Sequence, residues 1–434
     1  MKSLDAKLAE IKSNPSSRSF IIADAKDADM AFGVRAPGPR SYLSARGERP
    51  ARFSPEVWSR EEFGYRNLPE FLDIIREVVH QGITDIMLMS AYVNEQLSIH
   101  EGLFRNSCVT PAVRANDTTD VWAVRHGCYA KEPAQTFRTA TIDHIQCGQI
   151  ECDLDDGAEF PGANLGLYSV TFVNELDQDR DTLLRFKEFR DEAERKKFRY
   201  FLEVFDPNVA SGIPKEKLGE FINDMILRSL AGVTESSRPL FLKIVYHGPR
   251  AMEELAQYDP NLVVGILGGG AGTTYDAFKL IHDAQKHGAR IALFGRKINN
   301  AEHQLAFIEM LRLITDGKIT PEEAVRAYHG VLEAKKIKPK LPLDKDLELT
   351  DQSMSYDGSS TARSSVNIRN NPLRQTAVAT SVEKENRSRE TAPPTPDAQP
   401  IAWPVHPDST PDFSKMNPAQ RRAYDAQRLT RKFG

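Results

Sequence analysis

Short apolar runs alternate with amphipathic stretches along the chain up to about residue 330. The apolar runs have the length of buried strands, and the stretches between them repeat apolar residues every three or four positions, as helices do. The predicted strands span residues 20–24, 83–89, 120–126 or 137–143, 167–173, 200–205, 241–245, 262–267 and 290–294. The clearest predicted helices span residues 68–82, 181–197 and 216–232. This alternation favours an α/β fold with a closed (β/α)8 barrel of parallel strands over an open sheet.

The two ends of the chain depart from this alternation. We expect a helical extension over residues 1–17, the barrel over residues 18–334, a disordered linker over residues 335–412 and a short basic helix over residues 413–434. The linker is predicted because Ser, Thr, Asn, Pro and charged residues leave too few apolar side chains for a core. The final helix is predicted because Asn417 and Pro418 can start it and several arginines follow.

A further departure follows the first strand, where residues 33–66 are rich in Arg, Pro and Gly. This composition predicts a long loop. In a barrel the loop lies either over the C-terminal mouth, where active sites sit, or out in solvent as a surface excursion.

Composition restricts the class of protein. The formal net charge of −4 gives the whole chain no attraction to nucleic acid or to an anionic membrane. The N-terminus lacks the apolar core of a signal peptide, and no apolar run approaches the roughly 18 residues of a membrane span. We therefore expect a cytoplasmic protein with reduced thiols and without a metal site, since cysteine and histidine show no ligand spacing. The four cysteines are Cys108, Cys128, Cys147 and Cys152.

Lys243 lies inside the apolar strand FLKIV, where a charged side chain is costly unless it is used. Because strand residues alternate between faces, Lys243 shares a face with Phe241 and Val245, which in a barrel is the packed interior. Desolvation there favours the neutral amine, which can attack a carbonyl carbon. The alternative is a structural lysine that reaches the rim or pairs with a carboxylate.

Glu203, in YFLEVF, shares its parity with Phe201 and Phe205 and should also point inward. A carboxylate among aromatic side chains suits proton transfer near neutral pH. The alternative reading is a buried Glu203–Lys243 ion pair without catalysis.

Asp24 ends the first predicted strand, and an acid at the C-terminal end of a barrel strand indicates function. Asp27 follows closely in the loop, which leaves the assignment between the two open. Either carboxylate could instead be a helix N-cap.

Glycines follow the last two predicted strands. Gly268, Gly269 and Gly270 come after the penultimate strand, and Gly295 and Arg296 come after the final one. Loops at these two positions bind phosphate in many (β/α)8 barrels, because backbone N–H groups converge there. A Rossmann reading is weak, since no G-x-G-x-x-G spacing is present.

Together these segments resemble the class I, Schiff-base aldolases of (β/α)8 fold, especially the tagatose-bisphosphate branch and its fructose-bisphosphate relatives. The resemblance covers about residues 18 to 315, and the segments that carry it are FLEVFDP, FLKIVYHG and AFKLIHDAQKHGARIALFGRKI. It implies that Lys243 forms the imine and that Glu203 transfers protons. It also implies that Gly295, Arg296 and Gly268 to Gly270 bind substrate phosphate. The chain departs from the archaeal-type branch, which has a tyrosine acid near Phe205, and its glycine loop is longer.

The sequence therefore predicts a metal-independent, cofactor-independent carbon–carbon lyase acting on a small phosphorylated sugar or aldehyde. Lys243 would form the imine, Glu203 would shuttle the proton and Asp24 would orient substrate or lysine. Two alternatives stay open: another phosphate-binding barrel enzyme, such as an isomerase or a thiolase-like transferase, and a catalytically silent barrel used for interactions. No nucleic-acid or membrane partner is expected, and homo-oligomerisation is left open.

Overall fold

The computed structural model describes residues 1–14, 16–38, 65–154, 158–269 and 272–351, with scattered residues between 402 and 424. The chain divides into two units, Met1–Val366 and Asn367–Gly434. The predicted Arg-rich loop lies largely outside the described residues, as do the predicted linker from residue 352 to 401 and most of the predicted basic helix.

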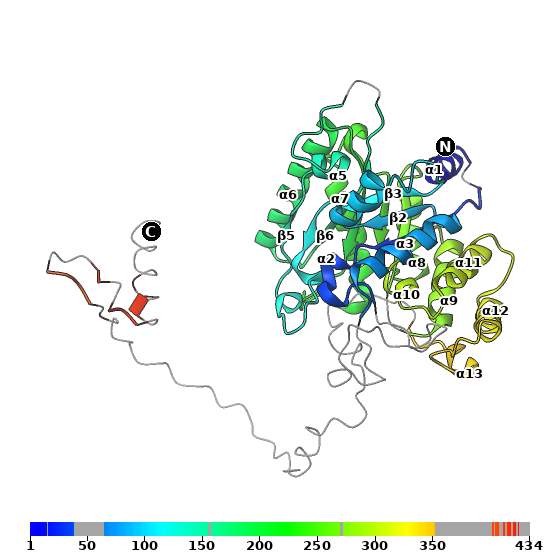
Figure 1. Ribbon diagram of the computed structural model, residues 1–434. Helices are drawn as coiled ribbons and strands as arrows, with labels where there is room; N and C mark the ends of the chain where they lie inside the picture. The colour runs from blue at the N-terminus through cyan, green and yellow to red at the C-terminus, as the bar shows by residue number, and fades with distance from the viewer. Residues whose placement is uncertain are drawn as a thin grey trace, which may run out of the picture. The chain divides into compact units, whose positions relative to one another are not determined.

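The first unit is built on a closed barrel of eight parallel strands, surrounded by helices (Figure 1). Around the barrel the order is β1-β10-β9-β8-β7-β6-β3-β2, so each strand lies beside its neighbour along the sequence. The eight strands are β1 (Ile21–Lys26), β2 (Ile86–Met89), β3 (Thr110–Arg114), β6 (Leu165–Thr171), β7 (Arg199–Phe205), β8 (Phe241–Ile244), β9 (Val263–Gly268) and β10 (Ile291–Phe294). The predicted fold class is confirmed.

Seven of the eight strands fall where the apolar runs predicted them, and the third does not. Neither 120–126 nor 137–143 joins the barrel; β3 precedes both. Two short strands, β4 (Asp117–Thr118) and β5 (Thr136–Phe137), instead form a separate antiparallel pair. The prediction was wrong because β3 reads TPAVR, in which Pro111 and two polar residues conceal the apolar pattern of a strand.

Helices follow most of the strands, as the alternation predicted. The longer helices are α1 (Ser3–Ser13), α3 (Leu68–Gln81), α5 (Ile142–Cys147), α6 (Leu176–Arg195), α7 (Leu218–Leu230), α8 (Pro249–Tyr258), α9 (Thr274–Lys286), α11 (Gln304–Thr315) and α12 (Pro321–Ala334). The shortest are α2 (Asp29–Phe32), α4 (Ala91–Asn94), α10 (Arg296–Asn299) and α13 (Leu343–Asp346). Within the described part of the chain, no helix combines the length and apolar character needed to cross a membrane.

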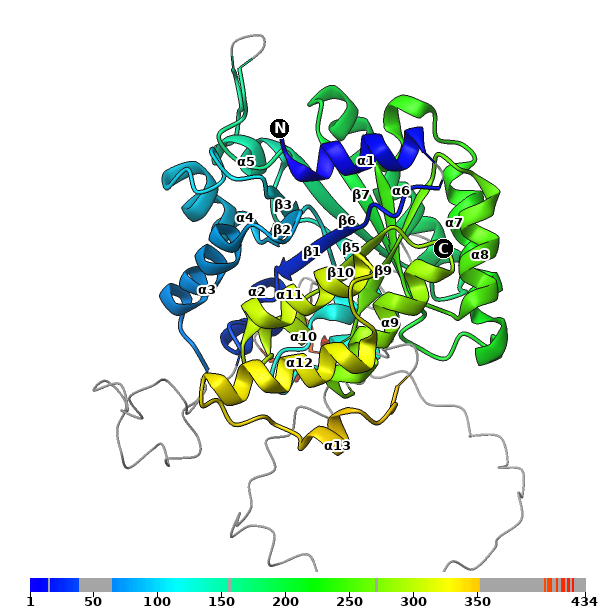
Figure 2. The same cartoon turned by 90° about the vertical axis from the view of Figure 1, so that its right-hand side faces the viewer.

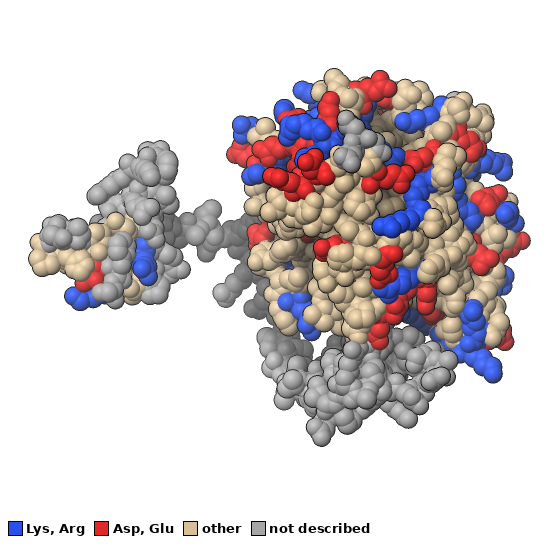
Figure 3. Space-filling view, turned by 45° about the horizontal axis from the view of Figure 1, so that its top comes forward, with Lys and Arg blue, Asp and Glu red and all other residues tan. Residues whose placement is uncertain are grey.

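The core has an inner and an outer layer. Strand residues such as Ile21, Ala23 and Phe201 fill the barrel, whereas their sequence neighbours pack against the surrounding helices. Leu4 and Leu8 of α1 belong to the inner layer, so this N-terminal helix closes one end of the barrel (Figure 2). On the face shown in Figure 3, acidic and basic side chains are interspersed, in keeping with the small net charge.

Residues 335–351, which composition assigned to the tail, are ordered against the barrel. α13 lies beside α12, and Asp346 of α13 accepts a hydrogen bond from the Thr274 N–H at 2.7 Å. Ile337, Leu343 and Leu347 of this segment also pack against the core, so the segment is held by apolar as well as polar contacts.

Cys147 and Cys152 form a disulfide, which corrects the expectation that all thiols are reduced. α5 ends at Cys147, and Gly148 reverses the chain with a left-handed φ of 75°. The two Cα atoms consequently lie 5.4 Å apart, a separation that suits a disulfide. Cys108 and Cys128 are free and exposed.

Candidate active site

The pairing register brings four residues into one row of the barrel wall. Ser169 of β6 lies opposite Glu203 of β7, Glu203 opposite Lys243 of β8, and Lys243 opposite Gly265 of β9. Phe201 and Phe241, two residues earlier on β7 and β8, belong to the inner layer. Glu203 and Lys243 share their parity and therefore point into the barrel, as the alternation predicted.

Glu203 and Lys243 form a buried ion pair. The Lys243 Nζ contacts Glu203 Oε1, and the two side chains are 9% and 1% exposed, respectively. The second carboxylate oxygen, Oε2, accepts a hydrogen bond from Ser169 Oγ at 2.7 Å and lies 3.5 Å from Arg114 Nη2. One oxygen of Glu203 is therefore held by the barrel wall, while the other faces the lysine amine.

Arg114, at the end of β3, links this pair to the loop after β1. Its Nε donates to Asp27 Oδ2 at 2.6 Å, and its Nη1 donates to Ser169 Oγ at 3.1 Å. Burial disfavours the guanidinium charge, but the carboxylates of Asp27 and Glu203 outweigh burial and raise the pKa of Arg114. Sequence reasoning missed Arg114 because it did not locate β3, whose short TPAVR segment does not read as an apolar run.

Asp24 does not join this network. Its register partners, Met87 and Phe294, belong to the outer layer, whereas Ala23 belongs to the inner one. Asp24 instead pairs with Lys26 Nζ at 2.9 Å, and both side chains are fully buried. Burial raises the pKa of Asp24 and lowers that of Lys26. The pleat of β1 thus turns Asp24 away from Lys243, and Asp27 is the acid that reaches the network.

An apolar layer covers the paired charges on the side of the strand ends. Phe205 and Val245, two residues beyond Glu203 and Lys243, cluster with Val121 and Leu267, and Trp122 packs against them. The paired charges thus lie between this layer and the stacked rings of Phe201 and Phe241, whose centroids are 4.5 Å apart. Such an environment strengthens electrostatic interactions at Lys243.

Asp117, just beyond β3, lies at the edge of this apolar layer. Trp122 Nε1 donates to its Oδ2 at 2.7 Å. Burial is the main cause that raises the pKa of Asp117 to about 6, and Arg114 partly opposes it.

The candidate phosphate loops are adjacent, because Gly268 at the end of β9 pairs with Phe294 at the end of β10. Glycine is required at position 268, since a Cβ there would overlap the Phe294 ring. Gly295 follows Phe294 and lies close to β1, where a Cβ would come within 3.0 Å of Ala25 O. Gly269 follows β9 directly and Arg296 begins α10, while Gly270 lies outside the described residues. Packing alone accounts for Gly268, so phosphate binding stays a prediction.

No protein-family model matches the chain, and no curated protein sequence matches it. Among solved structures, an archaeal fructose 1,6-bisphosphate aldolase aligns with 73% of this chain and 100% of its own, at 12% identity and a TM-score of 0.47. A fructose-bisphosphate aldolase from Slackia heliotrinireducens aligns with 82% of this chain and 95% of its own, at 12% identity and a TM-score of 0.49. Cgl0159 from Corynebacterium glutamicum aligns with 73% and 94%, at 14% identity and a TM-score of 0.44. At these distances the function has to be argued from the site itself.

Proposed function

We propose that this chain is a class I aldolase-like lyase that cleaves or forms a carbon–carbon bond through an imine on Lys243. The observation that carries the proposal is the Lys243–Glu203 pair, in which an amine and a proton acceptor touch in the buried interior of the barrel. Nucleophilic catalysis by lysine needs such a pair, because the amine must lose a proton before it attacks.

The first half of the reaction forms the iminium. Lys243 gives a proton to Glu203 Oε1, and the neutral nitrogen bonds to the substrate carbonyl carbon. A proton moves from nitrogen to oxygen to give a carbinolamine, and Glu203 then protonates that hydroxyl so that water leaves. Ser169 and Arg114 hold Oε2 throughout, so Oε1 keeps facing the nitrogen.

The second half breaks the carbon–carbon bond. The hydroxyl of the leaving fragment gives its proton to Glu203, the bond breaks, and its electron pair moves toward the iminium nitrogen to form an enamine. The leaving fragment departs as an aldehyde or ketone. Glu203 then protonates the enamine carbon, and addition of water to the resulting iminium releases the second product and restores the lysine.

We propose further that the substrate carries a phosphate, held by backbone N–H groups of Gly268 to Gly270 and Gly295 and by the Arg296 side chain. The proposal is supported by the adjacency of the two strand ends that carry these residues. An arginine beside backbone donors suits a phosphate because its N–H groups bind oxygens in a charge-assisted way.

Borohydride reduction tests the imine. The full chain is incubated with a panel of phosphorylated ketoses and aldehydes, reduced, and examined by intact mass and peptide mapping. We expect one adduct, on the peptide that contains Lys243, and none in Lys243→Met. The matched control removes the other buried lysine pair, as Lys26→Met with Asp24→Asn, and should keep the adduct. If no compound gives an adduct on Lys243, the pair is a structural ion pair and the proposed reaction is wrong.

A further inference from the structure

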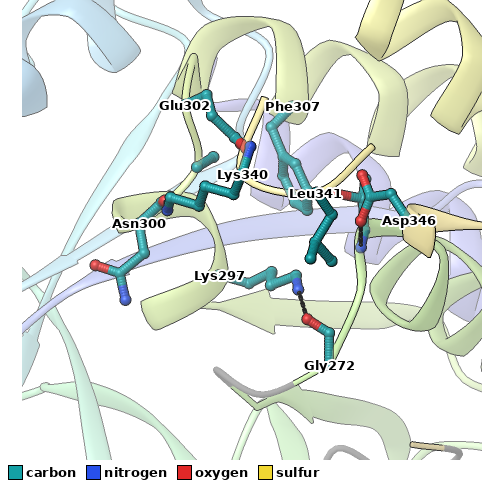
Figure 4. Close-up of a pocket in the computed structure, with 10 residues that line it drawn as sticks. Gly272, Lys297, Asn300, Glu302, Phe307, Lys340, Leu341 and Asp346 are labelled. Carbon is teal, nitrogen blue, oxygen red and sulfur yellow. Dashed lines mark hydrogen bonds between the residues drawn. The ribbon is translucent and has the colours of Figure 1, made fainter. Parts of the chain in front are cut away.

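The segment from residue 340 to 350, here called the strap, is bonded at one end to residues just after α10 and at the other end to the start of α9. At one end, Lys340 donates from its backbone N–H to Glu302 Oε1 at 2.7 Å, and its Nζ donates to Asn300 O just after α10. Figure 4 shows Lys340 and Leu341 of the strap on one side of a cavity, and Lys297 of α10 and Gly272 before α9 on another.

At its other end the strap is bonded to the start of α9, where the glycine loop ends. Asp346 Oδ1 accepts from the Thr274 N–H at 2.7 Å, and Glu348 O accepts from Thr273 Oγ1 at 2.8 Å. Thr350 donates to Asp276 from its N–H at 2.8 Å and from its hydroxyl at 2.5 Å. Asp276 also accepts the Thr273 N–H at 2.7 Å. Four hydrogen bonds from the strap thus fix the residues that follow Gly272.

The loops that follow β9 and β10 are also joined to each other beneath the strap. Lys297 Nζ, on α10, donates to Gly272 O at 2.6 Å, and a cavity of about 140 Å³ separates this contact from the strap (Figure 4). Burial lowers the pKa of Lys297 to about 8. Asp346 is itself fixed, because its Oδ2 lies 2.9 Å from His329 Nε2 of α12. The strap, α10 and the start of α9 therefore form one bonded unit.

We infer that the strap is a positioning element for phosphate binding, with Asp346 and Thr350 as its positioning residues. The inference rests on the proposed function, because it assigns the strap to the loops proposed to hold the substrate phosphate. A glycine-rich loop loses much conformational freedom when it closes on an anion. A strap that already fixes Thr273, Thr274 and Asp276, which follow the loop, reduces that loss on binding, so phosphate binds more tightly.

Truncation and point variants of the full chain test the inference. A chain ending at residue 351 keeps the strap, whereas one ending at residue 335 removes it. Asp346→Ala removes the acceptor for the Thr274 N–H, and Asp346→Asn should restore it in part. Lys345→Ala is the matched control, because the Lys345 side chain pairs with the exposed side chain of Glu348 on the same segment. Thermal unfolding shows which variants fold.

The main measurement is the affinity for inorganic phosphate, which does not depend on turnover. We expect Asp346→Ala and the chain ending at residue 335 to bind phosphate at least fivefold more weakly. The chain ending at residue 351 and Lys345→Ala should match the full chain. In active enzyme KM for the phosphorylated substrate should rise, while imine trapping with an unphosphorylated carbonyl compound stays unchanged.

Three outcomes decide the matter. Phosphate affinity that is unchanged in folded Asp346→Ala, or absent in the full chain, overturns the inference. Equal loss of trapping with phosphorylated and unphosphorylated compounds also overturns it, because the strap would then support the whole barrel. Phosphate binding that depends on the strap without any adduct on Lys243 keeps the inference and rejects the proposed lyase reaction.

Discussion

Replacing Glu203 by glutamine separates proton transfer from the shape of the site. In the unaltered chain Ser169 Oγ donates to Glu203 Oε2 at 2.7 Å. Glutamine keeps an acceptor for this hydroxyl, but it cannot take a proton from Lys243. General acid–base catalysis contributes roughly 10²- to 10⁴-fold to rate. We therefore expect kcat to fall by about that factor, which corresponds to about 3 to 5 kcal/mol of transition-state stabilisation.

The same change should also lower the free energy of unfolding. Breaking a buried ion pair typically costs about 3 to 5 kcal/mol, because one charge is left without a partner. We place the expected loss at the lower end, about 3 kcal/mol, because Arg114 keeps its other carboxylate partner, Asp27, at 2.6 Å.

The assay pairs steady-state turnover with denaturant unfolding for Glu203→Gln, Lys243→Met and the double variant. Ser169→Ala serves for comparison, since it removes the hydrogen bonds of Ser169 Oγ to Glu203 and Arg114 while keeping the Glu203–Lys243 pair, and it should cost about 1.5 to 3 kcal/mol in stability. The double variant should be less destabilised than the sum of the two single variants, because each removes the other's unpaired charge. Turnover of Glu203→Gln within threefold of the unaltered chain would refute the assigned role of Glu203.

Three further predictions concern the phosphate loops, pH and metals. Arg296→Ala should lower the affinity for phosphorylated substrates by about tenfold to a hundredfold and leave the affinity for unphosphorylated analogues unchanged. Equal losses for both kinds of compound in competition assays would show that these loops are structural turns. Asp117→Asn should raise the free energy of unfolding at pH 7 by up to about 3 kcal/mol, because burial raises the pKa of Asp117 to about 6. The folded state binds a proton at Asp117 more tightly than the unfolded state does, so Asp117 lowers the free energy of unfolding as pH rises from about 4 to 6. If this free energy falls as steeply over that range in Asp117→Asn as in the unaltered chain, the assignment is contradicted. Activity should survive dialysis against a strong chelator, because the iminium is itself the electron sink, and turnover that returns only with zinc would count against the mechanism.

The local pattern of the chain determined much of the fold. Seven strands and the main helices could be predicted because period-2 and period-3.6 patterns are local properties of the sequence. Glu203 and Lys243 could be paired in advance, since each is the one charged residue within its apolar run and the two runs are consecutive strands. Consecutive strands of a parallel barrel are neighbours, so adjacency followed from order alone.

The orientation of Asp24 required the tertiary structure. Barrel strands are apolar on both faces, so Ala23 and Ile22 give no sign of which face is the interior. The apolar pattern therefore does not show which side a polar residue at a strand end faces, and the fold pairs Asp24 with Lys26 rather than with Lys243.

Contacts between distant residues were likewise decided only by the fold. Arg114 meets Asp27 across 87 positions, and Thr350 meets Asp276 across 74. A single sequence carries no signal for such pairs, because the two partners are distant along the chain and only folding brings them together. The strap illustrates this most clearly: it lies in the stretch that composition assigned to the tail, and hydrogen bonds to the start of α9 hold it in place together with Leu343 and Leu347, which pack against the core.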